Sequence, residues 1–232
     1  MDAVWPGFRA PRPFSLRMKL PRIGWCDRKE FILSRSAGKK VLHLGCADWP
    51  YTEERLRSGA LLHLALRRVA PQTTGLDVQP VGIELLRRAG IPDVHLGDAQ
   101  KSLLELFPCP FEVLVAGEVL EHLPNPGVFL QSLAGVCSED SSLLITVPNF
   151  ACLKRFPRLL WRIELVHPDH VSYYSYSTLN RLLELTGFRI IEWMAYWGDN
   201  NFLSKLANPL FRRLPFLQYY ADGFCISARL RE

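Results

Sequence analysis

Short apolar runs and longer amphipathic stretches alternate along the first two thirds of the chain. The apolar runs predict buried strands at residues 40–44, 73–77, 93–98, 111–116 and 142–147. Apolar residues at helical spacing predict helices at residues 52–69, 81–89 and 128–136, with Thr52 as the N-cap of the first. Strands that alternate with helices in this way are typical of a parallel sheet covered by helices on both faces.

The ends of the chain have a different pattern. Residues 1–22 contain four prolines and no sustained periodicity, and a short helix is expected at 26–36. We therefore expect residues 1–37 to form an N-terminal arm and lid, and residues 38–232 to form a single domain. Within that domain, a helix is predicted at 177–186, strands at 188–196 and 224–230, and cover elements on the substrate side at about 149–176 and 199–221.

Composition is that of an ordinary globular protein. The 232 residues are 48% hydrophobic and 22% charged. No apolar run approaches a membrane span, and basic residues interrupt every apolar stretch of the N-terminus, which is not the pattern of a secretory signal. The six cysteines are scattered without a CxxC pair, so we expect reduced thiols in a cytoplasmic protein.

Basic charge is concentrated at the N-terminus. The first 40 residues contain ten Lys and Arg against three Asp and Glu, whereas the remainder contains 18 against 20. A nucleic-acid-binding domain would normally carry its basic stripe on the fold itself, so a nucleic-acid partner is not expected. The arm is interpreted as a solvated tail, with contact to an anionic substrate or to membrane headgroups as the alternative.

The stretch Gly117-Glu118-Val119-Leu120-Glu121-His122-Leu123 directly follows the predicted strand 111–116. If it turns helical, Glu118, Glu121 and His122 share one face, because residues three and four apart are neighbours on a helix. Ligands of open α/β sheets bind outside the carboxyl ends of the strands. Two carboxylates and an imidazole at such a point indicate proton transfer or metal binding.

Three other predicted strands end in residues suited to a nucleoside ligand. Gly45 lets a ligand approach the backbone after the first strand. Asp77, at the tip of the second, can accept hydrogen bonds from both ribose hydroxyls, and Asp98, after the third, can accept one from an adenine amino group. The structural alternative for each aspartate is a turn residue or a helix N-cap.

Taken in order, these strand ends resemble the class I S-adenosylmethionine-dependent methyltransferases. The resemblance rests on Val41–Cys46, Gly75–Asp77, Gly97–Ala99 and Gly117–Leu123, and it continues through Leu143–Asn149 and His170–Ser175. It covers roughly residues 38–197. No single motif is decisive, but the ordered set is specific.

The resemblance implies a Rossmann-like, doubly wound α/β fold with a seven-stranded sheet of order 3-2-1-4-5-7-6, strand seven being antiparallel. It implies S-adenosyl-L-methionine as cofactor, S-adenosyl-L-homocysteine as product, and a cofactor site formed by His43, Gly45, Cys46, Ala47, Asp77, Val78, Asp98, Ala99, Gly117 and Glu118. The chain departs from the family where it has His43 in place of an acidic residue, and Ala47 and Trp49 in place of a fuller glycine pattern. These departures put the affinity for the cofactor in question, and Asp48 or an oxygen near residues 116–118 is expected to replace the missing carboxylate.

The Glu-x-x-Glu-His cluster has three interpretations within the family. Some relatives, such as RNA 3′-end 2′-O-methyltransferases and ubiquinone-pathway O-methyltransferases, bind a divalent metal there. The corresponding ligands in this chain are Glu118, Glu121, His122 and a later histidine. The sequence offers His167 and His170 for the last of these, and His170 is the expected ligand. In other relatives the pair positions the cofactor or acts as a base without metal, which is the interpretation favoured here. The third interpretation is purely structural.

The predicted function is methyl transfer from S-adenosylmethionine to a hydroxyl of a small molecule, saccharide or secondary metabolite, with Glu118, Glu121, His122 and His170 as catalytic residues. An N-methyltransferase and a non-catalytic binding protein on the same fold are the alternatives. A dinucleotide-dependent oxidoreductase is disfavoured because residues 45–50 lack GxGxxG spacing. Basic and apolar residues interleave in both predicted covers, as in 153–162, which suits an anionic or lipid-linked acceptor or a peripheral membrane contact. The oligomeric state is not predicted.

Overall fold

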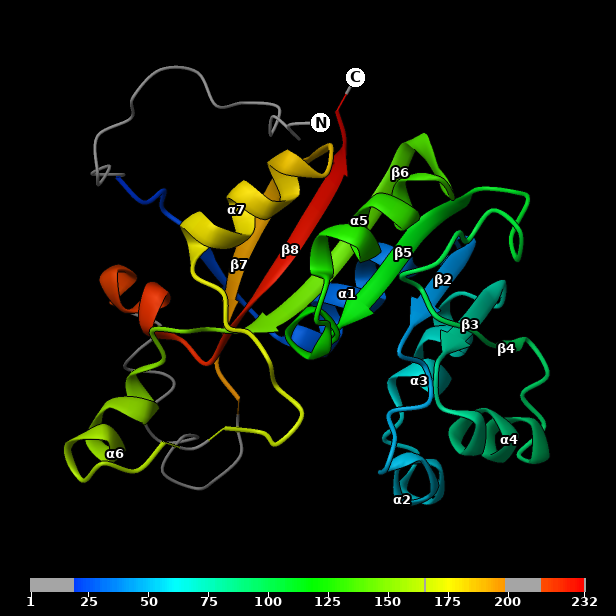
Figure 1. The fold of residues 1–232 in the computed structure, drawn as a ribbon, viewed down its shortest axis with the longest axis horizontal. Coiled ribbons are helices and arrows are strands. Elements are labelled where there is room, and N and C mark those ends of the chain that lie inside the picture. Colours follow the sequence, from blue (N-terminus) through cyan, green and yellow to red (C-terminus); the bar gives the residue numbers. More distant parts are fainter. Residues whose placement is uncertain (1–18, 165, 199–213, 232) are drawn as a thin grey trace, which may run out of the picture.

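An eight-stranded sheet forms the centre of the molecule, as a computed structural model of residues 19–164, 166–198 and 214–231 describes it (Figure 1). The strands are β1 (Gly24–Cys26), β2 (Val41–Leu44), β3 (Thr73–Asp77), β4 (Val94–Leu96), β5 (Phe111–Gly117), β6 (Cys137–Pro148), β7 (Phe188–Tyr196) and β8 (Gly223–Leu230). Their order across the sheet is β1-β7-β8-β6-β5-β2-β3-β4. β8 is antiparallel to both of its neighbours, and the other pairings are parallel.

Seven of these strands confirm the predicted order 3-2-1-4-5-7-6, with the predicted seventh strand, β8, antiparallel. The eighth, β1, was not expected. It adds three residues to the outer edge of β7, with Gly24 opposite Met194 and Cys26 opposite Tyr196. A strand of three residues has too few positions to show an alternating pattern in the sequence.

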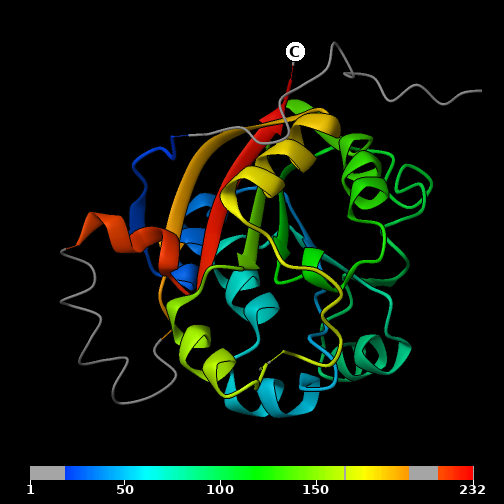
Figure 2. The same ribbon diagram turned by 60° about the vertical axis from the view of Figure 1, so that its left-hand side comes forward.

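The helices lie on both faces of the sheet. They are α1 (Arg28–Ser36), α2 (Thr52–Ser58), α3 (Leu62–Val69), α4 (Pro80–Arg88), α5 (Pro126–Ala134), α6 (Phe156–Leu160) and α7 (Tyr176–Leu185), with 3-10 turns η1 (Leu120–His122), η2 (Leu153–Arg155) and η3 (Pro215–Tyr220). Figures 1 and 2 show α5 and α7 over one face, with α1 behind the other. The central strands β2 and β5 are therefore covered on both faces, whereas Leu96 of β4 and Ile191 of β7 are exposed.

The burial of β5 explains why its sequence is a continuous apolar run. Leu114 and Ala116 face the core that α5 and α7 cover, whereas Val113 and Val115 face the core that α1 and α3 cover. All four side chains are 0% exposed. A parallel strand buried on both faces has no polar side, so it loses the alternation seen in half-exposed strands.

The predicted helix at 52–69 is wrong in one respect, because two helices occupy that range. α2 ends before Gly59, which has a φ of 68°, and α3 begins at Leu62. Glycine adopts this left-handed conformation without a Cβ clash, and it commonly ends helices. Thr52 is not the N-cap either: Tyr51 takes that place, and Thr52 lies buried in the first turn.

The predicted arm and covers are described in part. Residues 24–26 and 28–36 belong to β1 and α1, while residues 1–18 of the arm and 199–213 of the second cover lie outside the described residues. The lid role of the arm stays a prediction. Within the ranges that the structure describes, no helix has both the length and the apolarity needed to cross a bilayer.

Candidate functional site

The carboxyl ends of β2, β3 and β5 meet at one edge of the sheet. β2 pairs with β3 on one side and with β5 on the other, so Gly45, Asp77 and Glu118 follow or end adjacent strands. Gly45 is exposed, has a φ of 71°, and donates its N–H to the carbonyl of Leu76 at 2.9 Å. A Cβ at this position would lie 3.0 Å from Cγ2 of Val119. Only glycine leaves this turn both unstrained and open.

Asp77 joins two strand ends through its carboxylate. One oxygen accepts the N–H of Ala47 and the other accepts the N–H of Gln79, both at 2.9 Å. The side chain is largely buried, with 8% of the residue exposed. A carboxylate has about four lone-pair positions, so each oxygen retains the capacity to accept a further hydrogen bond. The predicted ribose contact and a structural role are therefore compatible.

Ala47 and His43, two departures from the family pattern, both face the interior. The Cβ of Ala47 is so close to Gly82 of α4 that a Cβ on Gly82 would lie 2.6 Å from it. His43 is 3% exposed and stacks on His63 of α3, with 5.4 Å between ring centroids and 3.2 Å between the Nδ1 atoms. A direct contact between His43 and a cofactor would require the ring to leave this stack.

The predicted adenine side of the site is more open. Val78 is 56% exposed, and Asp98 and Ala99 are half-buried in the turn after β4. Asp98 accepts the N–H of Gln100 at 2.9 Å, and the hydroxyl of Ser132 donates to the carbonyl of Ala99. The carboxylate of Asp98 thus stabilises its turn and keeps an oxygen available at the edge of the site.

Glu118 is held in place by hydrogen bonds to two strands. Its Oε1 accepts hydrogen bonds from Thr146 of β6 and Tyr196 of β7, both at 3.0 Å. The residue has a φ of 55°, which is uncommon for a residue with a Cβ and marks a position worth functional scrutiny. Its backbone N–H donates to the carbonyl of Thr146 at 2.9 Å.

Arg28, at the start of α1, is the functional candidate that sequence reasoning missed. Its guanidinium lies 3.7 Å from Oε1 of Glu118 and 5.9 Å from the ring centroid of Tyr196. Burial raises the pKa of Asp48, and the positive charges of Arg55 and Arg28 act against that rise. Arg28 therefore faces two carboxylates of the site. The sequence offered no signal for it, since it is one of ten basic residues among the first 40.

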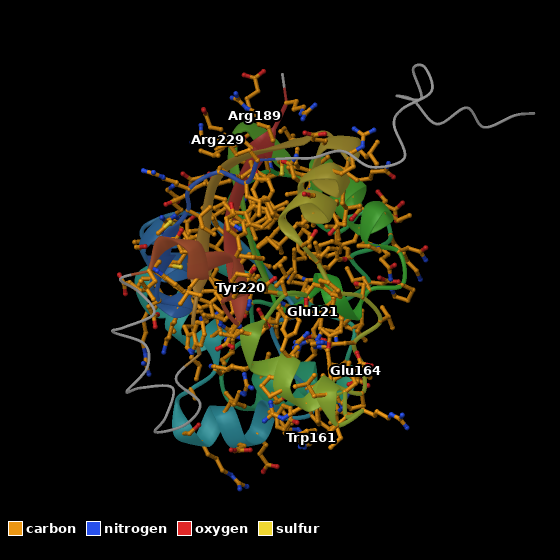
Figure 3. The ribbon with its side chains drawn as sticks, turned by 90° about the vertical axis from the view of Figure 1, so that its left-hand side faces the viewer. Glu121, Trp161, Glu164, Arg189, Tyr220 and Arg229 are labelled. Atoms are coloured by element: carbon orange, nitrogen blue, oxygen red, sulfur yellow. The ribbon has the colours of Figure 1, made fainter. Side chains whose placement is uncertain are left out.

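Glu121, labelled in Figure 3, has an unusual environment for a carboxyl group. It is 0% exposed, and neither side-chain oxygen has a hydrogen-bond partner. Burial, followed by the charge of Glu118, raises its pKa to about 9, so the group is protonated at neutral pH. Its backbone carbonyl accepts the N–H groups of Val171 and Ser172, which ties the segment after α6 to this turn.

His122 belongs to a different group of side chains from the two glutamates. Residues 120–122 form a single 3-10 turn that leaves out Glu118, so the condition for one shared helical face is not met. The ligand atoms of His122, His167 and His170 lie within 4.8 Å of one another, and no other such group occurs among the described residues. Burial, together with the charges of His122 and His167, lowers the pKa of His170 to about 4. Neutral imidazoles of this kind can bind a metal ion or accept a proton.

The predicted metal ligands are thus divided between two places. His122 and His170 are brought together, with 4.6 Å between ring centroids, and His167 joins them. Glu118 instead contacts Thr146, Tyr196 and Arg28, and the oxygens of Glu121 are enclosed without a partner. The role of each residue in catalysis stays a prediction.

Comparisons with known proteins agree with this architecture. A family model described as a methyltransferase domain matches residues 19–192. The ubiquinone biosynthesis O-methyltransferase of Photorhabdus laumondii is 30% identical over 119 residues, which is 48% of this chain and 43% of that protein. The mitochondrial ubiquinone biosynthesis O-methyltransferase of Schizosaccharomyces pombe is 25% identical over 182 residues, which is 75% of this chain and 60% of that protein.

The alignment with the first of these relatives thus spans less than half of its length. Among solved structures, a SAM-dependent methyltransferase from Archaeoglobus fulgidus superposes with a TM-score of 0.55 at 18% identity, over 87% of this chain and 94% of that one. At that identity the likeness shows a shared fold.

Proposed function

Because the chain belongs to the methyltransferase domain family, we propose that it transfers a methyl group from S-adenosylmethionine to a hydroxyl group of a small-molecule acceptor. Its relatives in bacteria and yeast carry the name O-methyltransferase, which supports a hydroxyl rather than an amine as the acceptor. The cofactor supplies an electrophilic methyl group on a sulfonium. The chain's own residues bind the cofactor, orient the acceptor and hold its proton.

The observation that carries the proposal is the Asp77 carboxylate at the tip of β3. Its two oxygens are fixed by the backbone of Ala47 and Gln79, and each can still accept one more hydrogen bond. A fixed pair of acceptors fits the adjacent 2′- and 3′-hydroxyls of a ribose. The exposed Val78 beside it offers an apolar surface for the adenine, and Asp98 an acceptor for its amino group.

The amino-acid end of the cofactor fits the charges around Arg28. That end carries a carboxylate and an ammonium, and Arg28 and Glu118 offer one charge of each sign, 3.7 Å apart. In this proposal Glu118 replaces the carboxylate that His43 cannot supply. The neighbouring Lys29 is exposed and provides a matched control, because it has the same charge on the same turn of α1.

This assignment predicts unequal effects of two neighbouring substitutions. We expect Arg28→Ala to weaken binding of S-adenosylhomocysteine by roughly tenfold or more, as the loss of one charge-assisted contact implies. Lys29→Ala should leave the affinity unchanged. Equal effects of the two variants in titration calorimetry would contradict the placement of Arg28.

We propose that the three clustered histidines act on the methyl acceptor, as bases or as metal ligands. His122 or His170 can take the proton of an acceptor hydroxyl as the methyl group is transferred. The same cluster also fits a divalent metal ion, because three imidazoles are the protein ligands of several catalytic zinc sites. A metal there would lower the pKa of a bound hydroxyl. Its ligands in this chain would be His122, His167 and His170.

Metal binding has a direct test. Zn²⁺, Mn²⁺ and Mg²⁺ are titrated into chelator-treated protein and into a His167→Ala variant, with the exposed His95 substituted as a control. Stoichiometric binding that His167→Ala abolishes supports the metal. Absence of binding to the unmodified protein, with full activity in chelator, rejects the metal and leaves the histidines as bases.

The central proposal is tested by calorimetry with S-adenosylhomocysteine and NAD. We expect S-adenosylhomocysteine to bind and Asp77→Ala to abolish binding, while Asp140→Ala, an exposed aspartate on β6, has no effect. Binding of NAD instead would overturn the assignment. Labelled methyl transfer to panels of hydroxyl and amine acceptors then separates the O-methyltransferase from an N-methyltransferase, and absence of transfer to both supports a binding protein.

A further inference from the structure

The segment after β6 exposes an unusual number of large apolar side chains. Nine of the 21 exposed large apolar residues in the described part of the chain lie between residues 150 and 171. Leu160 is 78% exposed and Trp161 is 72% exposed. We call this region the 150–171 surface; its most exposed apolar members are Phe150, Phe156, Leu159, Leu160, Trp161 and Val171.

These side chains do not pack into the hydrophobic core of the domain. Neither η2 nor α6 contains a buried residue, so the helix has no face packed against the domain. Contiguous apolar patches on soluble proteins mark contacts with partners or membranes, because such contacts remove the apolar area from water. Single exposed apolar residues need no such explanation, but a cluster of this density does.

Basic residues alternate with the apolar residues of this surface along the sequence. Residues 150–171 include four basic residues and two acidic ones. Lys154 is used within the fold, where its ammonium pairs with Asp222 at 2.6 Å. Arg158 and Arg162 are both exposed, and neither forms an ion pair with a described residue. Among the described residues, Arg158 donates only to the backbone carbonyl of Lys154, at 2.9 Å. The surface thus offers two guanidinium groups without an ion pair to a described carboxylate, beside a tryptophan and several aliphatic side chains.

We propose that the 150–171 surface docks the protein on an anionic lipid bilayer. Tryptophan and aliphatic side chains enter the boundary between headgroups and acyl chains, and arginines contact the anionic headgroups. This charge complementarity favours a bilayer over a second copy of the chain, because an isologous contact would bring the guanidinium groups of Arg158 and Arg162 close to those of the other copy. Figure 3 shows Trp161 and Glu164 at the end of the molecule opposite Arg189 and Arg229, so one end alone would meet the membrane.

The position of this surface links docking to the candidate site. Figures 1 and 2 both show α6 beyond the edge of the sheet where β6 ends, which is the edge that carries the site. The guanidinium of Arg155 lies 4.3 Å from the ring centroid of Tyr173, and that ring lies 5.9 Å from the ring of His170. Docking would turn the histidine cluster toward the lipid. The methyl acceptor would then be an amphiphilic molecule held in the bilayer. This statement about the acceptor rests on the proposed function, whereas the docking itself does not.

Vesicle flotation tests the docking with the full chain. The probe is phosphatidylcholine vesicles, with and without phosphatidylglycerol. We expect binding to the anionic vesicles only, and we expect Arg158→Glu with Arg162→Glu to weaken it by roughly 30-fold or more, as two lost basic contacts imply. Leu160→Ser with Trp161→Ser should also remove most of it. Val128→Ser with Ile191→Ser is the control, because these residues are also large, apolar and exposed, at 47% and 51%, but lie on other elements.

The outcomes are distinct. Wild-type protein that fails to float with anionic vesicles, or surface variants that float as well as wild type, overturns the proposal. A wild-type dimer that Leu160→Ser with Trp161→Ser converts to a monomer also overturns it, since the surface then covers a second copy. Titration with S-adenosylhomocysteine accompanies every variant. Retained cofactor binding shows that a variant is folded, and it separates a failure of docking from a failure of the methyltransferase assignment.

Discussion

Protonation of the buried pair His43–His63 should make the protein unstable in mild acid. The two rings are stacked in the interior, with exposed fractions of 3% and 0%, and one Nδ1 donates a hydrogen bond to the other at 3.2 Å. Only one proton can lie between the two atoms, so the contact requires at least one neutral ring. The Nε2 atom of His63 has no hydrogen-bond partner, so a charge on this ring would be buried without compensation.

The size of the effect follows from the pKa of His63. Burial, followed by the positive charge of Arg67, lowers this pKa from 6.5 to about 4. The unfolded chain therefore binds a proton between pH 6.5 and 4 that the folded protein does not bind, and stability falls as the pH falls through this window. At pH 5 the loss from His63 alone is about 2 kcal/mol relative to pH 7. Burial and the charge of His63 also lower the pKa of His43, which adds to the loss in the same direction.

Urea unfolding at pH 7 and pH 5 measures this loss. The free energy of unfolding of the wild-type protein should fall by at least the amount given above, and the fall should be smaller in His63→Leu by about 2 kcal/mol. His95→Leu is the control, because His95 is exposed and its substitution should leave the pH dependence of the wild type unchanged. If wild type and His63→Leu lose the same stability between the two pH values, the reasoning about the buried pair is wrong.

Three further substitutions test the packing around the site. Gly82→Ala should destabilise the fold by about 1–3 kcal/mol, because the new Cβ would lie 2.6 Å from that of Ala47, and adding Ala47→Gly should restore most of the loss in a urea titration. Asn149→Ala should cost about 2–4 kcal/mol by the same measurement, since its amide is 1% exposed and donates to two backbone carbonyls at 2.8 and 2.9 Å that would lose their partner. Arg35→Ala should cost less than about 1 kcal/mol, because its ion pair with Glu192 is about one third exposed; a larger loss would indicate that packing rather than charge is at stake.

The sheet was predictable because its central strands are apolar on both faces and because helices of regular spacing separate the strands. β3 and β7 occupy the predicted residues without any shift. The errors have local causes. Gly59 interrupts a stretch whose apolar spacing alone looks continuous, and the turn at 120–122 is too short for helical periodicity to apply. β1 depends on its pairing with β7, some 170 residues away, which no local pattern encodes.

The candidate site was predictable where it depends on strand ends. Asp77 and Glu118 stand where the predicted strands stop, and parallel strands bring such positions to one edge. Arg28 and His167 could not be placed in the same way. Their positions depend on side chains that converge from segments outside the strand–helix repeat, α1 in one case and the segment after α6 in the other. The sequence shows that these residues are ionisable, but it does not show which side chains they contact.

The departures from the family pattern do not argue for a protein that has lost its cofactor. His43 is matched by His63 in the interior, and Ala47 is matched by Gly82, so each replacement has a compensating residue on a helix behind the strand end. Neither side chain projects toward the exposed turn at Gly45. The negative charge absent at position 43 is present at Glu118, where Thr146 and Tyr196 fix it and Arg28 balances it. A strained backbone at Glu118 and its three side-chain partners are not expected at a site that is no longer selected to bind a ligand. The charged pair of Arg28 and Glu118 therefore distinguishes two hypotheses, a protein that binds the cofactor and one that has lost it. If the cofactor binds at this pair, Arg28→Ala weakens binding in calorimetry and Lys29→Ala does not.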